Sequence, residues 1–281
     1  MLSIQSSVAY GHVGNSAAVF SLQRLGFSVW PVNTVHFSNH TGYGDWRGPV
    51  LRAEDVADVV RGIEDRGVLS HCDAVLSGYV GDASLGRVVL DAVGRVKAAN
   101  PRAIYCCDPV MGDADRGFFV RSGIPGFMRE EALAAADVIT PNRFELEFLA
   151  GRAVSSLDDA LAAADEARAL GPGLVLVTSL LRREAPPGTI EMLVASAEGA
   201  WLVGTPLLPL SVNGAGDVAS ALFLARLLRG ARPEEALSET ASSVYAVLEE
   251  THRARAREIR LIAAQDAIAD PPERFAAQRV R

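Results

Sequence analysis

Cysteine is scarce in this sequence, and its 27 basic residues are outnumbered by 34 acidic ones; each feature excludes a class of protein. The 281 residues include only three cysteines, and two of them, Cys106 and Cys107, are adjacent and cannot readily pair with each other. A disulfide framework is therefore not expected, and reduced thiols in the cytoplasm are the simplest interpretation. The formal net charge of −7 and the pI near 5.3 argue against a nucleic-acid or membrane-surface partner.

Long hydrophobic runs are also missing. No apolar run is long enough to span a bilayer, and the first residues lack the pattern of a signal peptide, so we expect a cytoplasmic protein without a membrane partner. The hydrophobic content is nevertheless 49%, and the mean hydropathy is +0.17. A chain of this length and composition can bury a large core within one α/β domain.

Short apolar runs alternate with longer helical patterns along the chain, which predicts a mostly parallel central sheet flanked by helices on both faces. No repeat or low-complexity linker divides the sequence, so we expect a single domain over residues 1–281, with a peripheral tail after about residue 270. The last two strands are expected to form a hairpin at Glu198–Gly199 on the sheet edge. The predicted strands are Leu2–Gln5, Val29–Val35, Ala74–Tyr79, Ala103–Asp108, Asp137–Thr140, Leu174–Ser179, Met192–Ala195 and Ala200–Val203, and the clearest helices are Ser84–Ala99, Asp158–Leu170 and Pro233–Glu250.

The segment Ser211–Asp217 is the strongest functional signal. Its Gly-Ala-Gly run lets the backbone approach an anion closely, and the apolar helix that follows directs its amide N–H groups toward the loop. Asp217 at the mouth of such a loop is placed to take a proton from a hydroxyl group, as a small-molecule kinase requires. The alternative is structural, because a glycine-rich turn with an aspartate before a helix is a common device.

Polar residues collect where the predicted strands end. Ligands of open α/β sheets bind beyond the carboxyl ends of the strands, so residues there are expected to meet at one rim. A set of purely structural caps would not need to converge in this way. The residues concerned are Ser6, Thr41, Tyr79, Asp108, Thr140, Glu145, Thr178 and Ser179.

Further motifs give the chain a specific resemblance. In the order in which they occur, they resemble those of pyridoxal kinases, the vitamin-B6 branch of the ribokinase-like family, from Leu2 to about Asp270. The Asn-Thr-Val-x-Phe-Ser-Asn-His-Thr run is more specific to this branch than the glycine-rich loop. The segments that carry the resemblance are Ser3–Ser16, Asn33–Gly44, Leu76–Tyr79, Asp108–Asp113 and Thr140–Glu145.

The resemblance implies a single ribokinase-like domain that phosphorylates the 5′-hydroxymethyl group of pyridoxal with ATP. Asp217 is then the general base and also contacts the substrate, while the Gly214, Ala215 and Gly216 amides stabilise the transferring group. The structural alternatives are that Ser6 and Thr41 serve turns and that the apolar members belong to the core. The residues implied for the vitamer are Ser6, Val13, Phe37, Thr41, Gly42 and Tyr79.

An acidic set is implied for the nucleotide side. Mg²⁺ prefers oxygen ligands and keeps several waters, so a few carboxylates together with phosphate oxygens suffice. The resemblance adds a monovalent cation, K⁺ or Na⁺, and a homodimer. Asp108 could instead end a strand in a turn, and Glu145 could serve the N-terminus of a helix. The implied metal ligands are Asp108, Asp113, Thr140 and Glu145, and the nucleotide site adds Thr178 and Ser179.

The sequence departs from its bacterial relatives in three places. Thr178 stands where many of them carry a lysine, the lid Ala114–Phe119 lacks a cysteine that some have, and Leu207–Val212 is about three residues shorter. The rival functions are a hydroxymethylpyrimidine kinase or another ribokinase-like kinase, and a non-catalytic B6-binding protein. The Asn33–Gly44 segment disfavours the first rival, and the intact Asp217 disfavours the second.

Overall fold

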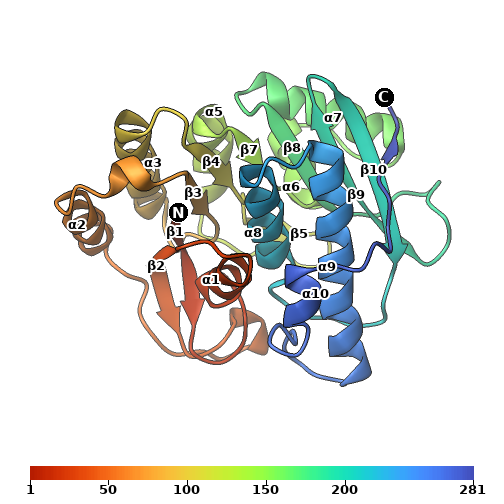
Figure 1. The fold of residues 1–281 in the computed structure, drawn as a ribbon, viewed down its shortest axis with the longest axis horizontal. Coiled ribbons are helices and arrows are strands. Elements are labelled where there is room, and N and C mark those ends of the chain that lie inside the picture. Colours follow the sequence, from red (N-terminus) through yellow and green to blue (C-terminus); the bar gives the residue numbers. More distant parts are fainter.

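Strands and helices alternate along the chain as the apolar pattern predicts. The computed structural model describes all residues, 1–281 (Figure 1). The strands are β1 (Leu2–Val8), β2 (Trp30–Phe37), β3 (Ala74–Ser77), β4 (Ile104–Cys107), β5 (Gly112–Asp113), β6 (Gly117–Phe118), β7 (Val138–Ile139), β8 (Leu174–Leu180), β9 (Thr189–Ser196), β10 (Gly199–Pro206) and β11 (Gln278–Arg279). The α-helices are α1 (Asn15–Arg24), α2 (Ala53–Glu64), α3 (Ala83–Ala99), α4 (Ile124–Phe127), α5 (Leu133–Ala135), α6 (Arg143–Ala150), α7 (Leu157–Ala169), α8 (Ala215–Leu228), α9 (Pro233–Arg253) and α10 (Gln265–Ala269), with 3-10 turns at Thr41–Tyr43 and Leu69–His71 and a π turn at Met128–Ala132.

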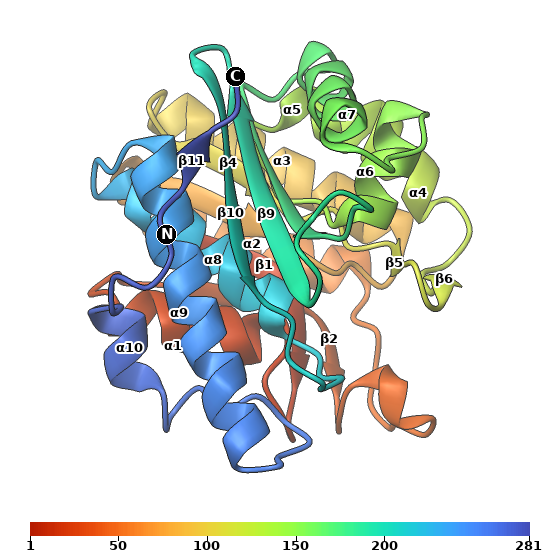
Figure 2. The same cartoon turned by 90° about the vertical axis from the view of Figure 1, so that its right-hand side faces the viewer.

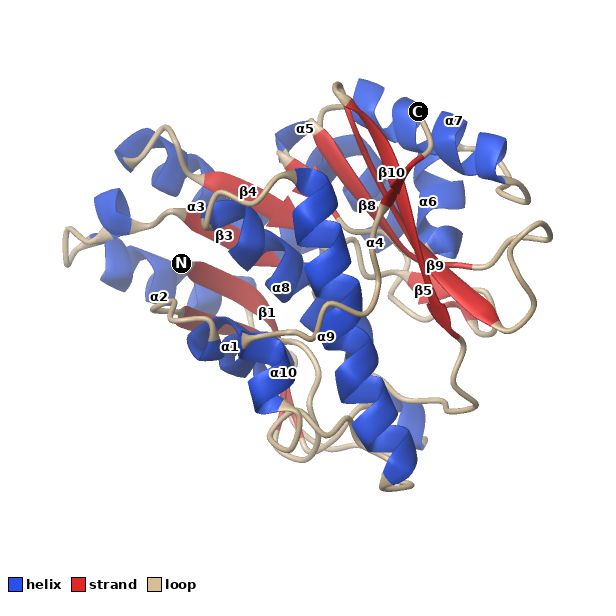
Figure 3. Ribbon diagram, turned by 45° about the vertical axis from the view of Figure 1, so that its right-hand side comes forward, coloured by secondary structure: helices blue, strands red, loops and turns tan.

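One nine-stranded sheet runs through the molecule in the order β11-β10-β9-β8-β7-β4-β3-β1-β2. The pairs from β2 to β8 are parallel, and the pairs β8–β9, β9–β10 and β10–β11 are antiparallel. Helices cover both faces of the sheet (Figure 3). The predicted fold class, a single α/β domain with a mostly parallel central sheet, is therefore confirmed.

Each face of the sheet has its own buried core. The core on one face includes Leu22 of α1, Phe223 of α8 and Leu237 of α9. The core on the other face is built around α2, α3, α6 and α7, with Leu85 and Leu146 among its fully buried side chains. Helix α8 is buried along almost its whole length, because α1 and α9 pack against it. None of the helices is both long and apolar enough to cross a membrane.

Three elements differ from the sequence-based prediction. Strand β1 continues to Val8, so Ser6 lies within the strand rather than after it. The hairpin of β9 and β10 does not form the sheet edge, because β11 pairs with β10 through Trp201 and Leu202 (Figure 2). The small hairpin of β5 and β6 was not predicted, and it projects from the carboxyl end of β4.

Candidate active site

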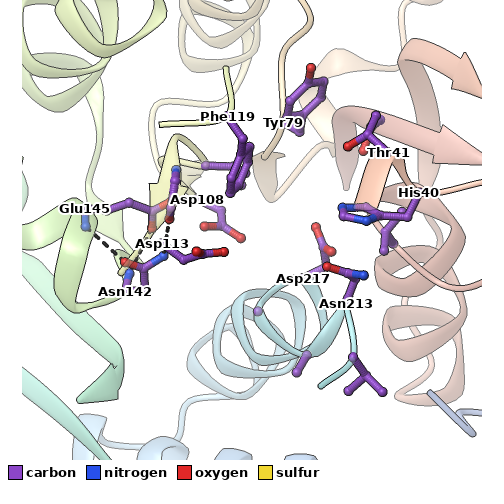
Figure 4. Close-up of a pocket in the computed structure, with 18 of the residues that line it drawn as sticks. His40, Thr41, Tyr79, Asp108, Asp113, Phe119, Asn142, Glu145, Asn213 and Asp217 are labelled. Carbon is purple, nitrogen blue, oxygen red and sulfur yellow. Dashed lines mark hydrogen bonds between the residues drawn. The ribbon is translucent and has the colours of Figure 1, made fainter. Parts of the chain in front are cut away.

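A cavity of about 260 Å³ lies beyond the carboxyl ends of the parallel strands (Figure 4). The converging residues predicted from sequence all line it, as do Val13, Phe37, Asp113 and the loop Gly214–Asp217. Gly42 is the exception among the predicted site residues, since it lines two adjoining cavities instead. The structure therefore brings these predicted residues to one rim.

The N-terminus of α8 forms the floor of this cavity. Gly214 precedes the helix with φ 94°, and a Cβ atom there would lie 1.9 Å from the carbonyl oxygen of His12. No side chain caps the helix, so the amides of Ala215 and Gly216 are available to an anion. Burial raises the pKa of Asp217 in this first turn to about 6, against an opposing hydrogen bond from the Gly14 amide. A carboxylate with such a pKa can accept a proton near neutral pH.

The loop after β1 presses on the same floor. Gly14 adopts φ 53°, and a Cβ atom there would lie 2.2 Å from the carbonyl oxygen of Ser6 and 2.3 Å from its Oγ. A glycine is required at this position, because any larger residue would clash with the Ser6 backbone in a left-handed conformation. Gly14 therefore contacts both Ser6 and, through its amide, the Asp217 carboxylate.

Asp108 lies on the wall beside the floor, directly after β4. Its Oδ2 accepts a hydrogen bond of 3.0 Å from the Ser220 hydroxyl, which also lies 2.7 Å from Thr140 Oγ1. Burial raises the pKa of Asp108 well above its ordinary value, and the negative charges of Glu145 and Asp217 add to the effect. An unpaired buried carboxylate of this kind favours a cation as its partner.

Glu145 has a structural role that the sequence analysis left open. It forms a capping box with Asn142 at the start of α6, in which Asn142 N donates to Glu145 Oε2 at 2.9 Å. Its Oε1 accepts from the amides of Met111, at 2.8 Å, and Gly112. Burial raises its pKa to about 7, while these amides oppose the rise. No group of three or more His, Cys, Asp or Glu side chains is arranged to hold a metal ion by itself.

The β5–β6 hairpin places Asp113 and Arg116 at the edge of the cavity. Arg116 donates to Asp113 from its backbone amide and from Nε, each at 2.8 Å. Burial of Asp113 opposes ionisation, but these bonds and the charge of Arg116 outweigh it and hold the pKa of Asp113 below its ordinary value. As a metal ligand, Asp113 would first have to share its oxygens with this guanidinium.

The opposite end of the cavity is less charged. Ser6 is a buried residue of β1 whose hydroxyl is open to the cavity and makes no hydrogen bond within the chain, and the buried Val13 and Phe37 give an apolar wall. Thr41 begins a 3-10 turn capped by His40, whose Nδ1 accepts from the Gly42 amide at 3.0 Å. In Figure 4, His40 and Thr41 lie across the cavity from Asp108 and Glu145, and Asp217 lies between these two sides.

Contacts from distant segments fix the position of this 3-10 turn. Tyr43 donates to Glu258 Oε1 at 2.6 Å, and the other oxygen of Glu258 accepts from the amide of His12 at 3.3 Å. The hydrogen bond to Glu258 raises the pKa of Tyr43 to about 12. The guanidinium of Arg257 stacks 4.7 Å from the centre of the Tyr43 ring. We refer to Tyr43, Glu258 and His12 as the loop tie.

A second cavity, of about 520 Å³, adjoins the first one. The predicted short segment Leu207–Val212 lines it, as does the face of α9 that includes Val244 and Tyr245. Ser179 stands on the wall between the cavities with φ 52°, where a bulge interrupts the pairing of β8 with β9. The residues that line both cavities are Asp113, Arg116, Thr178, Ser179, Val212, Asn213, Ala215 and Gly216.

Several residues of the cavity were not singled out from the sequence. Arg116 lies in the lid that the sequence analysis named, yet only the folded hairpin shows that it faces the cavity. The available signal for Asn142 and Asn213 was their place inside the segments Thr140–Glu145 and Ser211–Asp217. The remaining unpredicted lining residues with polar or aromatic side chains are His40 and Phe119.

Comparisons with known proteins agree with this geometry. A family model described as phosphomethylpyrimidine kinase matches residues 59–260, so the fold and its polar rim belong to a class of small-molecule kinases. The pyridoxal kinase PdxY of Rubrobacter xylanophilus is 70% identical over 281 residues, covering 100% of this chain and 97% of that protein. Its counterpart from Leifsonia xyli subsp. xyli is 55% identical over 280 residues, covering 100% and 99%.

A solved structure gives the same result. The pyridoxal kinase from Leishmania donovani in complex with ADP and pyridoxamine matches with a TM-score of 0.93 and 29% identity, covering 100% of this chain and 99% of that chain. The chain belongs to the pyridoxal kinase family.

Proposed function

We propose that this chain transfers the γ-phosphoryl group of ATP to the 5′-hydroxymethyl group of pyridoxal, giving pyridoxal 5′-phosphate and ADP. The observation that carries the proposal is the position of Asp217, a half-buried carboxylate at the free N-terminus of α8 where two cavities adjoin. The similarity to pyridoxal kinases, one of them in complex with ADP and pyridoxamine, supports a B6 vitamer and an adenine nucleotide as ligands.

In this reaction Asp217 accepts the proton of the substrate hydroxyl, whose oxygen attacks the γ-phosphorus in line with the leaving ADP. The amides of Gly214, Ala215 and Gly216 stabilise negative charge on the group in transfer. Ser6 donates to the pyridine nitrogen of the vitamer, and Thr41 bonds the polar substituents of the ring. The apolar side chains Val13, Phe37 and Tyr79 enclose its flat faces.

The nucleotide and its cations occupy the other side. Thr178 and Ser179 face the phosphates from the wall between the cavities. The carboxylates of Asp108 and Glu145 and the hydroxyl of Thr140 offer oxygen ligands, which suit Mg²⁺ and K⁺ or Na⁺. Asp108 is buried and forms no ion pair with a basic side chain, which fits a bound cation as its partner. Asp113 joins this set if Arg116 releases one of its oxygens. When bound, Mg²⁺ neutralises charge on the phosphates.

The proposed base gives a direct prediction. Asp217→Asn keeps the volume of the side chain but removes the proton acceptor, so kcat should fall by at least about 10²-fold while vitamer binding persists. Because the base acts only when ionised and its pKa lies near 6, wild-type kcat should decline as the pH falls below about 6. Steady-state rates from pH 5 to 8 test both statements. Near-normal turnover of a folded Asp217→Asn protein would contradict the mechanism.

The substrate itself is tested by a coupled ADP-release assay. Pyridoxal, pyridoxine, pyridoxamine and hydroxymethylpyrimidine are compared at saturating ATP, with and without EDTA and with K⁺ varied. The family model favours hydroxymethylpyrimidine as the second candidate substrate. Preferred turnover of a B6 vitamer supports the proposal, preferred turnover of hydroxymethylpyrimidine replaces it, and vitamer binding without turnover indicates a binding protein.

We also propose that residues 1–281 act as one kinase domain and that two copies form a homodimer. The continuous sheet from β2 to β11 supports the first statement, and the resemblance to pyridoxal kinases supports the second. Limited proteolysis tests whether the chain is cut into separate folded parts. Size-exclusion chromatography with light scattering gives the mass of the protein in solution, and a mass equal to that of one chain would exclude the dimer.

A further inference from the structure

The wall between the two cavities is where a phosphoryl group must cross if ATP and the vitamer bind as proposed. Arg116 is the only arginine or lysine that lines either cavity, and it lines both. The chain has a single lysine, Lys97, whose ammonium is paired with Asp137 at 2.8 Å, and neither residue lines the cavities.

The side chain of Arg116 is held in place on two sides. Asp113 accepts from its Nε at 2.8 Å and from its Nη2 at 2.5 Å. The ring of Phe119 lies under the guanidinium, with 4.6 Å between Cζ and the ring centre. These contacts leave Nη1 without a protein acceptor, so its donors remain available to a ligand. A planar donor fixed in this way is suited to a phosphoryl oxygen.

A fixed positive charge at this point offsets negative charge in the cavity. Asp108, Asp113, Glu145 and Asp217 contribute four carboxylates, and a triphosphate adds further negative charge. The charge of Arg116 also reaches the far side of the cavity. Burial is the main cause of the lowered pKa of His40, and the positive charge of Arg116 lowers it further. Phosphoryl transfer spreads charge over the three equatorial oxygens of the moving group, and fixed cations stabilise that charge.

We propose that Arg116 contacts the phosphoryl group during transfer, with Asp113 and Phe119 as its positioning residues. The inference rests on the proposed function. In the step concerned, a bond forms between the substrate hydroxyl oxygen and the γ-phosphorus, and the bond to the bridging oxygen of ADP breaks. The hydroxyl proton goes to Asp217. Arg116 donates hydrogen bonds from Nη1 to the phosphoryl oxygens and exchanges no proton.

The test compares Arg116→Ala with Arg102→Ala. Arg102 is an exposed arginine that precedes β4, at the end of the strand opposite to Asp108, and its side chain makes no ion pair. Both variants lose one positive charge, but only the first loses it at the wall between the cavities. We expect Arg116→Ala to lower kcat by about 10²-fold, the usual effect of removing one fixed donor to a charged transition state. Arg102→Ala should stay within about twofold of wild type.

A binding measurement separates a catalytic contact from a structural one. Calorimetry with ADP alone, and with ADP, aluminium fluoride and pyridoxal together, compares ground-state binding with binding of a transition-state mimic. Arg116→Ala should weaken the second complex by about the factor lost from kcat/KM while ADP affinity changes by less than about threefold. Arg116→Lys, which keeps the charge but not the planar donor, should recover part of the loss.

Different failures have different meanings. If the wild type is active and Arg116→Ala is equally active, the role of Arg116 is overturned and the proposed function stands. Equal weakening of ADP and of the fluoride complex also overturns it, because the residue then acts in nucleotide binding or folding. Wild-type protein that phosphorylates no vitamer overturns both proposals.

Discussion

At the scale of single residues, Ser6 combines burial with a free hydroxyl. It lies within β1 at 8% exposure, lines the cavity, and makes no hydrogen bond to the protein. Its oxygen is open to the cavity, so an atom of a ligand bound there can be its hydrogen-bond partner. The adjoining contact with Gly14 prevents the strand from shifting to bury Oγ elsewhere.

The expected effect of Ser6→Ala follows from that geometry. The variant should weaken pyridoxal by about 1–3 kcal/mol, because a buried ring nitrogen would lose its donor, and should leave ATP affinity nearly unchanged. Calorimetric titration with each ligand in turn makes the comparison. Equal losses for the two ligands would show that Ser6 supports the fold rather than the vitamer.

At the scale of elements, the loop tie joins three segments that are distant in sequence. Tyr43 belongs to the 3-10 turn that carries Thr41, Glu258 follows α9, and His12 follows β1. A charged acceptor bonded to a phenol at 2.6 Å is a strong interaction, even where solvent reaches part of it. The turn therefore owes its position to the C-terminal part of the chain.

Removing the phenolic hydroxyl should loosen this turn. We expect Tyr43→Phe to raise KM for pyridoxal by about two- to tenfold, with little change in KM for ATP or in kcat, as loss of one net hydrogen bond implies. Tyr10→Phe is the matched control, because Tyr10 stacks edge-on against Tyr43 and its hydroxyl makes no hydrogen bond. Equal effects of the two variants would show that the tie does not position the turn.

The same elements show what the sequence could and could not predict. Periodic apolar runs predicted the main strands and helices, because burial of one face of an element leaves a regular spacing of apolar residues in the sequence. The strands of the β5–β6 hairpin and β11 are too short to have a period, and their pairing depends on where the chain returns in space. For the same reason the contact of Tyr43 with Glu258 has no local signal, although the motifs around Asp108 and Asp217 do.

At the scale of the whole molecule, helix α8 connects the packed interior to the candidate active site. Arg226 near its C-terminal end is 2% exposed and donates to Thr240 at 2.9 Å and Ser243 at 2.7 Å, both on α9. Its Nε also pairs with Glu239 at 2.8 Å. Burial lowers the pKa of Arg226 to about 10, which leaves it charged at neutral pH. This buried polar contact joins α9 to the helix that carries Asp217 in its first turn.

Loss of this contact should be costly. Arg226→Ala is expected to lower the free energy of unfolding by about 2–4 kcal/mol, because it leaves a cavity and two buried hydroxyls without their donor. The exposed Arg253 of α9, paired with Glu250, is the control, and Arg253→Ala should cost less than about 1 kcal/mol. Urea unfolding followed by circular dichroism measures both, and similar midpoints for the two variants would contradict the assignment.

The close approaches at Gly14 and Gly214 also limit how this protein can change over evolutionary time. Each position lies against a neighbouring backbone oxygen, so a substitution at either one would disturb the strand that carries Ser6 or the loop that carries His12. A lineage that acquires a new acceptor substrate must therefore vary the surrounding loops. The segment Leu207–Val212 is free to do so, because it lines the cavities without holding the floor together. The floor would be inherited unchanged while the substrates diverge.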